Sequence, residues 1–212
     1  GSNVRSTVAT YSGIFDDLRK LYGKISNNYT ASDFSYNTGK LKCPICDGTG
    51  IISMDVQFLP DVEMTCDDCN GTRYSHEVDH IYYNGYSIKD VMSLTISEAK
   101  EVFKENKKIK EKLQVFIDLG IGYLTLGEAT PALSGGEAQR LKLASEIGKV
   151  QDGSIFIFDE PSIGLHPKDI NTLLKVFQTL ISFKATIIVI EHDLDIIKNA
   201  DYIIDMGPEG GI

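Results

Sequence analysis

The four cysteines of this 212-residue sequence stand in two matched pairs that could bind a metal ion. Cys43 and Cys46 form one CxxC motif, Cys66 and Cys69 form the second, and the nineteen residues 47–65 separate them. This spacing is typical of a four-cysteine zinc site. A pair of disulfides is disfavoured in a reducing compartment, and a redox-active CxxC is disfavoured because two matched motifs are present. Four thiolates leave no open coordination position, so we expect the zinc to stabilise the fold and not to catalyse.

Glycines follow each cysteine pair and permit tight turns there. Gly48 and Gly50 follow the first motif and Gly71 follows the second. Because glycine adopts conformations that other residues avoid, these turns can direct backbone amides toward the thiolate sulfurs. Between the motifs, residues 51–58 are predicted to form a strand and residues 60–61 a turn.

A second group of residues could bind a phosphate. Residues 133–140 have the sequence LSGGEAQR, in which Ser134 and Glu137 form a capping box at the start of a helix. Gly135 and Gly136 would each cost that helix about 1 kcal/mol relative to alanine, so their presence suggests that a ligand approaches bare backbone. A helix N-terminus binds anions, and phosphate is the expected one. The alternative is an ordinary glycine-rich helix start.

A third group of polar residues follows two apolar runs. Residues 155–158 and 185–190 are predicted to be strands buried on both faces of a parallel sheet. Asp159 and Glu160 end the first run, and His192 follows the second. Ligands of such sheets bind outside the carboxyl ends of the strands. Asp159 could then hold Mg²⁺, Glu160 could polarise a water molecule, and His192 could contact a terminal phosphate. The alternatives are solvated loop acids and a structural histidine.

Other elements must position these three groups. We expect loop over residues 26–38 and a hairpin over 73–88 that turns at Asn84-Gly85. A capping box formed by Thr95 and Glu98 opens one predicted helix. The other predicted elements are helices over residues 13–22, 109–120, 167–181 and 194–200, and a strand over 202–205.

A cluster of lysines lies in and before one of these helices. It is either a solvated helix face or a surface that contacts phosphate backbones. The cluster comprises Lys104, Lys107, Lys108, Lys110 and Lys112.

The overall composition describes an acidic chain with enough apolar residues for a core. The net charge is −9, which disfavours a simple basic-surface binder, although local patches can override the global sign. Apolar residues make up 42% of the chain. The longest apolar runs fall far below the roughly 20 residues that a spanning helix needs, so we expect no membrane association and a cytoplasmic location.

Four of these motifs, in this order, resemble those of ABC ATPases. Residues 133–140 resemble the signature motif, residues 155–160 a Walker B segment and residues 162–166 a D-loop, while His192 resembles the switch histidine. The paired CxxC motifs and further segments narrow the resemblance to the C-terminal half of the UvrA family of excinuclease proteins. The further segments are residues 9–19, 34–37, 58–62 and 207–211.

The resemblance implies an α/β fold, an ABC-type ATPase core with parallel strands, a helical signature subdomain and a four-cysteine zinc-binding insertion. It implies an N-terminal core fragment over residues 1–42, the zinc module over 43–72, the signature subdomain over 73–140 and the ATPase core over 141–212. The implied cofactors are structural Zn²⁺, ATP and Mg²⁺. The implied catalytic residues are Glu160 and His192, and the implied nucleotide contacts are Ser134, Gly135, Gly136, Glu137, Gln139 and Asp159.

The resemblance also implies a function and its partners. The function is recognition of DNA damage in nucleotide excision repair. The implied partners are a damaged DNA duplex, a second UvrA-type copy and the second excinuclease subunit, UvrB.

The sequence departs from the family in two ways. It contains no phosphate-binding GxxxxGK[ST] motif, so we expect that this chain alone does not hydrolyse ATP. The signature motif and the Walker B segment are each expected to supply half of a nucleotide site, together with a phosphate loop that is not in this sequence. From Cys43 to Gly71 there are six acidic residues and no Lys or Arg, which disfavours phosphate contact by the zinc module. Two alternatives therefore stay open: a paralogue that protects against DNA-binding drugs, and a non-catalytic, zinc-stabilised interaction module.

Overall fold

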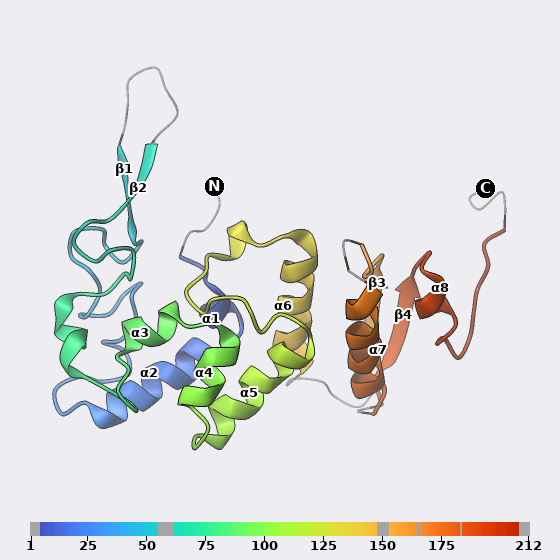
Figure 1. Cartoon of the computed structure of the whole chain (residues 1–212), viewed down its shortest axis with the longest axis horizontal. Helices are drawn as coiled ribbons and strands as arrows, with labels where there is room; N and C mark the ends of the chain where they lie inside the picture. Colours follow the sequence, from blue (N-terminus) through green and yellow to red (C-terminus); the bar gives the residue numbers. More distant parts are fainter. Residues whose placement is uncertain are drawn as a thin grey trace. The chain divides into compact units, whose positions relative to one another are not determined.

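The computed structural model divides the chain into two compact units, Gly1–Ser145 and Glu146–Ile212 (Figure 1). The structure describes residues 5–54, 62–147, 153–163, 165, 167–182 and 184–207. Each unit is described by itself.

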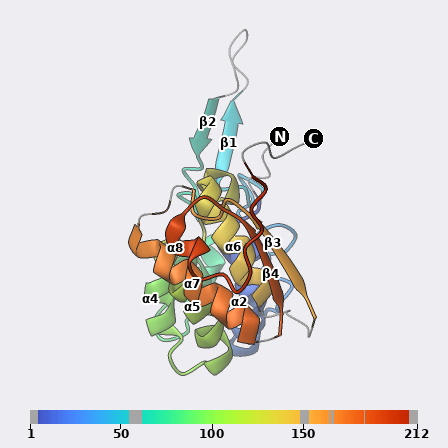
Figure 2. The same cartoon turned by 90° about the vertical axis from the view of Figure 1, so that its right-hand side faces the viewer.

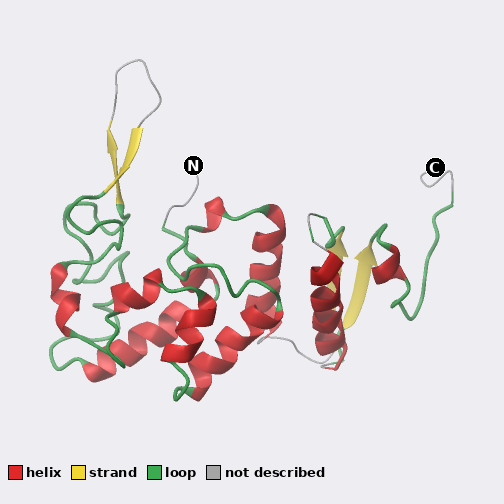
Figure 3. Cartoon of the chain, in the orientation of Figure 1, coloured by secondary structure: helices red, strands yellow, loops and turns green. Residues whose placement is uncertain are grey.

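The first unit consists mainly of short helices and loops (Figure 3). Side chains cap several of its helices, and Thr95 and Glu98 form the predicted capping box. No helix or strand occurs in residues 26–38, as predicted. The helices are α1 (Val8–Tyr11), α2 (Ile14–Ile25), α3 (Ile88–Ser93), α4 (Ile96–Val102), α5 (Lys107–Asp118) and α6 (Gly135–Ile147), with 3-10 segments η1 (His76–His80) and η2 (Thr130–Ala132).

The core of this unit lies where α2, α4 and α5 pack together. Leu18 of α2 and Leu113 of α5 are fully buried, because the apolar residues of each helix recur at helical spacing on one face. An aromatic group joins the helices to the loop that follows α2: the rings of Tyr22 and Phe34 have centroids 5.9 Å apart, and those of Tyr36 and Tyr74 are 6.0 Å apart.

A buried carboxylate ties α2 to α5. The side chain of Asp17 is 6% exposed and accepts hydrogen bonds from Lys108 Nζ and Lys112 Nζ, each at 2.6 Å. Burial opposes ionisation of this carboxyl, but the two lysines outweigh it and lower its pKa. Two lysines of the predicted cluster thus stabilise this unit, which neither interpretation of the cluster had anticipated.

Two strands extend beyond the helices of the first unit (Figures 1 and 2). Strands β1 (Ile51–Met54) and β2 (Val62–Thr65) pair antiparallel, with Ile52 opposite Met64 and Met54 opposite Val62. The strand predicted over 51–58 is confirmed for its first four residues. Its remainder and the turn predicted at 60–61 lie outside the described residues.

The hairpin predicted over residues 73–88 is wrong. Residues 76–80 form η1 instead, and strand-like pairing is limited to two isolated bridges, one between Tyr74 and Lys42 and one between Tyr83 and Tyr86 around the Asn84-Gly85 turn. The apolar pattern has a different cause: Val78 packs into the core from η1, while Tyr82 stays 55% exposed. The turn itself was predicted correctly, since Asn84 and Gly85 both have positive φ.

The second unit contains a parallel pair of strands, β3 (Ile155–Asp159) and β4 (Thr186–Ile190), as predicted. Helix α7 (Pro167–Ser182) packs against β4, and the ring centroids of Phe158 and Phe177 are 4.9 Å apart. A short helix, α8 (Leu194–Ile197), follows β4.

Burial of the sheet on both faces was predicted wrongly. Phe158 points toward α7, but the alternate residues Ile155 and Ile157 are 65% and 68% exposed, and Ile188 and Ile190 are 48% and 52% exposed. Among the described residues, no second layer covers this face. In α7, Ile181 is also 47% exposed.

Residues 202–205 do not form the predicted strand. Tyr202 is 83% exposed and Ile204 is 75% exposed, and neither pairs with β3 or β4. A strand needs a neighbour for its backbone hydrogen bonds, and the described part of the chain offers none here. Within the described residues, no helix has the length and apolar character required to cross a membrane.

Candidate functional site

The four cysteines converge at the base of the β1–β2 hairpin. Their sulfur atoms all lie within 4.8 Å of one another, with Cys43 Sγ 3.9 Å from Cys66 Sγ and Cys46 Sγ 3.7 Å from Cys69 Sγ. A tetrahedral site with Zn–S bonds of about 2.3 Å has sulfur atoms about 3.8 Å apart. All four thiols are buried, and none forms a disulfide. The donor set and its geometry therefore fit zinc.

Two backbone turns of the same shape hold these cysteines. After Cys46, the residues Asp47 and Gly48 have φ values of 52° and 76°; after Cys69, Asn70 and Gly71 have φ values of 49° and 77°. A threonine closes each turn: Thr49 Oγ1 donates to Cys46 O and Thr72 Oγ1 donates to Cys69 O, both at 2.7 Å. The glycines that the sequence analysis singled out thus occupy the left-handed conformation that favours glycine.

Burial and amide contacts set the protonation of the thiols. Burial raises the pKa of Cys43, whose thiol donates to Asp68 Oδ2 at 3.2 Å, and burial also raises the pKa of Cys69. Burial acts in the same direction on Cys46, but hydrogen bonds led by the Gly50 N–H, 3.2 Å from the sulfur, lower its pKa overall. The amide contact expected from the trailing glycines is confirmed at Gly50.

The glycine-rich helix start lies at the beginning of α6. Glu137 Oε2 accepts hydrogen bonds from both the backbone N–H and the hydroxyl of Ser134, each at 2.8 Å, which confirms the capping box. A Cβ added to Gly135 would meet no atom within 4 Å other than those of its chain neighbours and its own helix backbone. Nothing described in this chain therefore requires glycine at this position, and the bare backbone is open to an external group. Gly136 and Gln139 lie on the same helix.

A tyrosine that the sequence analysis missed also supports the start of α6. Tyr123 Oη donates to Glu137 Oε1 at 2.6 Å, and this bond comes first among the contacts that lower the pKa of Glu137. Tyr123 lies in a loop fourteen residues before Glu137, so no local sequence motif indicates this contact.

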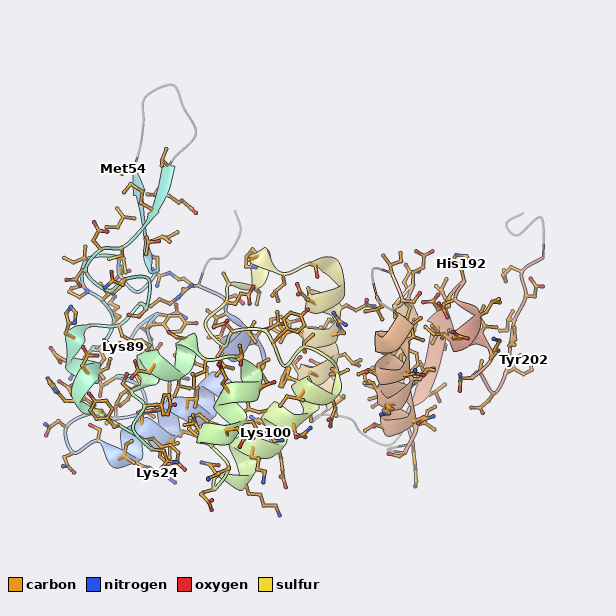
Figure 4. The ribbon with its side chains drawn as sticks, in the orientation of Figure 1. Lys24, Met54, Lys89, Lys100, His192 and Tyr202 are labelled. Carbon is orange, nitrogen blue, oxygen red and sulfur yellow. The ribbon has the colours of Figure 1, made fainter. Side chains whose placement is uncertain are left out.

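The strand ends of the second unit bring the predicted polar residues together. Asp159 is the last residue of β3, and Glu160 follows it with a φ of 46° and donates its N–H to Ile190 O at 2.9 Å. His192 Nε2 lies 3.2 Å from Glu160 Oε1. The His192 side chain is 83% exposed, so a ligand can reach it, and Figure 4 shows it beyond the end of β4.

Glu191, which sequence reasoning passed over, organises this edge of the sheet. Its Oε1 accepts from the Ser162 N–H at 2.8 Å, and its Oε2 accepts from the amides of His192 and Asp193 at 2.7 and 3.0 Å. Burial opposes ionisation, yet these donors hold the pKa of Glu191 below its usual range. The sequence could have indicated Glu191, because the pair Asp159-Glu160 after one strand is matched by the pair Glu191-His192 after the next.

Of the D-loop-like segment 162–166, residues 164 and 166 lie outside the described residues.

Comparisons with known proteins agree on one family. No family model matches the chain. The chain is 48% identical over a 216-residue alignment to UvrABC system protein A of Staphylococcus aureus strain COL, which covers 100% of this chain and 23% of that protein. The same protein of Staphylococcus epidermidis is 47% identical with the same coverage. A crystal structure of UvrA2 from Deinococcus radiodurans matches with a TM-score of 0.84 and 38% identity, over 92% of this chain and 24% of that one.

Proposed function

The chain belongs to the UvrA family and spans about a quarter of the relatives that it matches, and on this premise we propose that it is the part of an ATP-dependent DNA-damage recognition protein that contributes a signature motif, a Walker B segment and a zinc module. The process is nucleotide excision repair. The proposed partners of the longer protein are damaged duplex DNA, a second copy of itself and a second excinuclease subunit (UvrB), and its proposed location is the cytoplasm.

The observation that carries this proposal is the contact between Glu160 and His192 beside Asp159. In the proposed mechanism, Asp159 would supply oxygen ligands to Mg²⁺, which would neutralise charge on the nucleotide phosphates. Glu160 would accept a proton from the attacking water, and His192 would orient Glu160 and contact the terminal phosphate. Glu191 holds the backbone of His192 in place by accepting its N–H.

The start of α6 has a separate role in the proposed mechanism. Ser134, Gly135 and Gly136 present a helix N-terminus to the phosphates of a second nucleotide, bound by a phosphate loop that is not in this sequence. Glu137 fixes the Ser134 hydroxyl, and Gln139 lies further along the same helix. Because this arrangement only completes a site formed elsewhere, the isolated chain is expected to show no ATP hydrolysis.

The zinc ion has a structural role in this proposal. Cys43, Cys46, Cys66 and Cys69 would occupy all four coordination positions, which would leave no position for water or substrate. The ion would hold the β1–β2 hairpin on the first unit.

The experiment that tests the proposal replaces Glu160 with Gln in the longer protein that contains this chain. ATP binding should persist, while turnover should fall by about 100-fold or more, because the general base is lost. Asp195→Asn is the matched control, since Asp195 is an exposed acid of α8 whose side chain pairs with Lys198 in the described structure. Normal turnover in Glu160→Gln would contradict the proposed role.

A second candidate function is favoured by the acidic zinc module. A paralogue that protects cells from DNA-binding drugs would not need the preference for lesions that a repair protein shows. A fluorescence-anisotropy competition experiment on the longer protein, with ATP and Mg²⁺, distinguishes the two functions. It compares binding of a lesion-bearing duplex with binding of the same duplex without the lesion. Preference for the lesion supports repair, equal binding supports the paralogue, and no binding supports a non-catalytic interaction module.

A further inference from the structure

The two strands of the hairpin carry four large apolar side chains on one face. In the antiparallel register, Ile52 stands opposite Met64 and Met54 opposite Val62, and residues two apart on a strand share a face. The four side chains are 37%, 46%, 46% and 44% exposed in the order Ile52, Met54, Met64 and Val62. The opposite face carries Ser53, Glu63 and Thr65, with Ile51 half-buried. Figure 4 shows Met54 far from the helices of the first unit.

An uncovered ribbon of this kind is not stable by itself in water. Two-stranded sheets are marginal without a packing partner on their apolar face, and within the described part of the chain β1 and β2 contact mainly each other. Methionine side chains are flexible and suit surfaces that adapt to a bound protein. The face therefore has the properties of an interaction surface.

The charge around this face indicates which kind of partner could bind to it. The segment from Cys43 to Gly71 has six acidic residues and no Lys or Arg. Asp67 is exposed beside the base of the hairpin, and Glu63 is exposed on the face opposite the apolar one. Of the six acidic residues, Asp47 pairs with Arg5 and Lys42. Nucleic acid is bound mainly through Lys and Arg contacts to phosphates, so this surface is unsuited to it. A positively charged protein segment with an apolar stripe is complementary to it.

We propose that the apolar face formed by Ile52, Met54, Val62 and Met64 is a docking site for a basic amphipathic helix of a protein partner. A helix covers the apolar face of a sheet in many folds, and its flanking Lys or Arg side chains would reach Asp67 at the base of the hairpin. This inference is independent of the proposed nucleotide chemistry, because no residue of the hairpin face belongs to the candidate nucleotide site.

The test measures binding of a synthetic helical peptide with a leucine stripe flanked by lysines to the whole chain in its zinc-loaded form. The same peptide with glutamates in place of the lysines is the charge control. Saturable binding of the lysine peptide is expected, with at least about tenfold weaker binding of the glutamate peptide. Ile52→Thr/Met64→Thr should weaken binding of the lysine peptide at least about tenfold, because two apolar contacts are lost.

A matched variant on the opposite face, Ser53→Ala/Thr65→Ser, should bind as the unchanged chain does. Zinc content and circular dichroism of both variants establish that the hairpin is retained. Absence of saturable peptide binding would overturn the proposal. Direct binding of duplex DNA to the chain that Ile52→Thr/Met64→Thr abolishes would overturn it in favour of nucleic acid. A dimer in sedimentation that Ile52→Thr/Met64→Thr abolishes would overturn it in favour of a second copy of the chain.

Discussion

Replacing Asp17 with Asn removes the charge that holds α2 against α5. The Asp17 carboxylate accepts two hydrogen bonds of 2.6 Å from lysine ammonium groups, and a hydrogen bond to a charged group is worth about 1.5–3 kcal/mol. The side chains of Lys108 and Lys112 are 65% and 39% exposed, so water replaces part of what they lose. We therefore expect the free energy of unfolding to fall by about 2 kcal/mol, and the melting temperature by about 4–8 °C.

The pH dependence of the stability difference provides a stricter test of this prediction. The pKa of Asp17 is lowered in the folded state, so its stabilising effect is fully present above its ordinary pKa of 3.8 and is lost as the pH falls through the lower folded value. The difference between the unchanged chain and Asp17→Asn should be largest at about pH 7 and should shrink at about pH 3. Urea unfolding followed by circular dichroism measures this difference, because the chain has no tryptophan to report by fluorescence.

Asp16→Asn is the matched control for this experiment. Asp16 is the preceding residue of α2, its side chain is 62% exposed, and it pairs with Arg19 on the same helix. Exposed pairs of this kind contribute about 0–1 kcal/mol. Equal effects of Asp16→Asn and Asp17→Asn, or an Asp17→Asn effect that does not change between the two pH values, would refute the assignment of Asp17 as the buried link between the helices.

Three further substitutions test the cysteine cluster and two glycine turns. Cys46→Ala should lower the zinc content, measured by atomic absorption after gel filtration, from one ion per chain to none, and a zinc content that stays at one would contradict the four-thiolate site. Gly48→Ala should destabilise the chain by about 3 kcal/mol or more, because φ is +76° and the new Cβ would lie 1.7 Å from a backbone oxygen. Gly85→Ala should cost only about 1 kcal/mol, because φ is also positive but nothing lies within 4 Å; thermal unfolding that ranks the two equally would show that the close approach does not limit stability.

The sequence predicted best what depends on residues close together in the chain. The capping boxes at Ser134 and Thr95 need only a side chain and a partner three residues away, and both formed as predicted. The cysteine cluster joins residues distant in sequence, yet the CxxC spacing indicated it because two such pairs at this separation are typical of metal binding.

The sequence predicted poorly the features that depend on contacts with residues distant in the chain. The apolar runs of β3 and β4 indicated two buried faces, but burial requires a second layer that the described structure lacks, and Ile157 is 68% exposed. The alternation around Val78 and Tyr82 indicated a strand, although a single buried side chain on a 3-10 turn accounts for it. Tyr123 was missed because its contact with Glu137 arises only from tertiary folding, as does the contact of Glu191 with Ser162.

The open face of the β3–β4 sheet has a practical consequence for purification. Four isoleucines lie on this face, each at least 48% exposed, and the outer backbone edges of both strands have no partner strand among the described residues. Contiguous apolar surface and unpaired strand edges promote aggregation. Concentrated solutions of the isolated chain should therefore precipitate through the second unit, and replacement of Ile155 and Ile157 by threonine should raise the solubility limit without loss of the first unit's zinc.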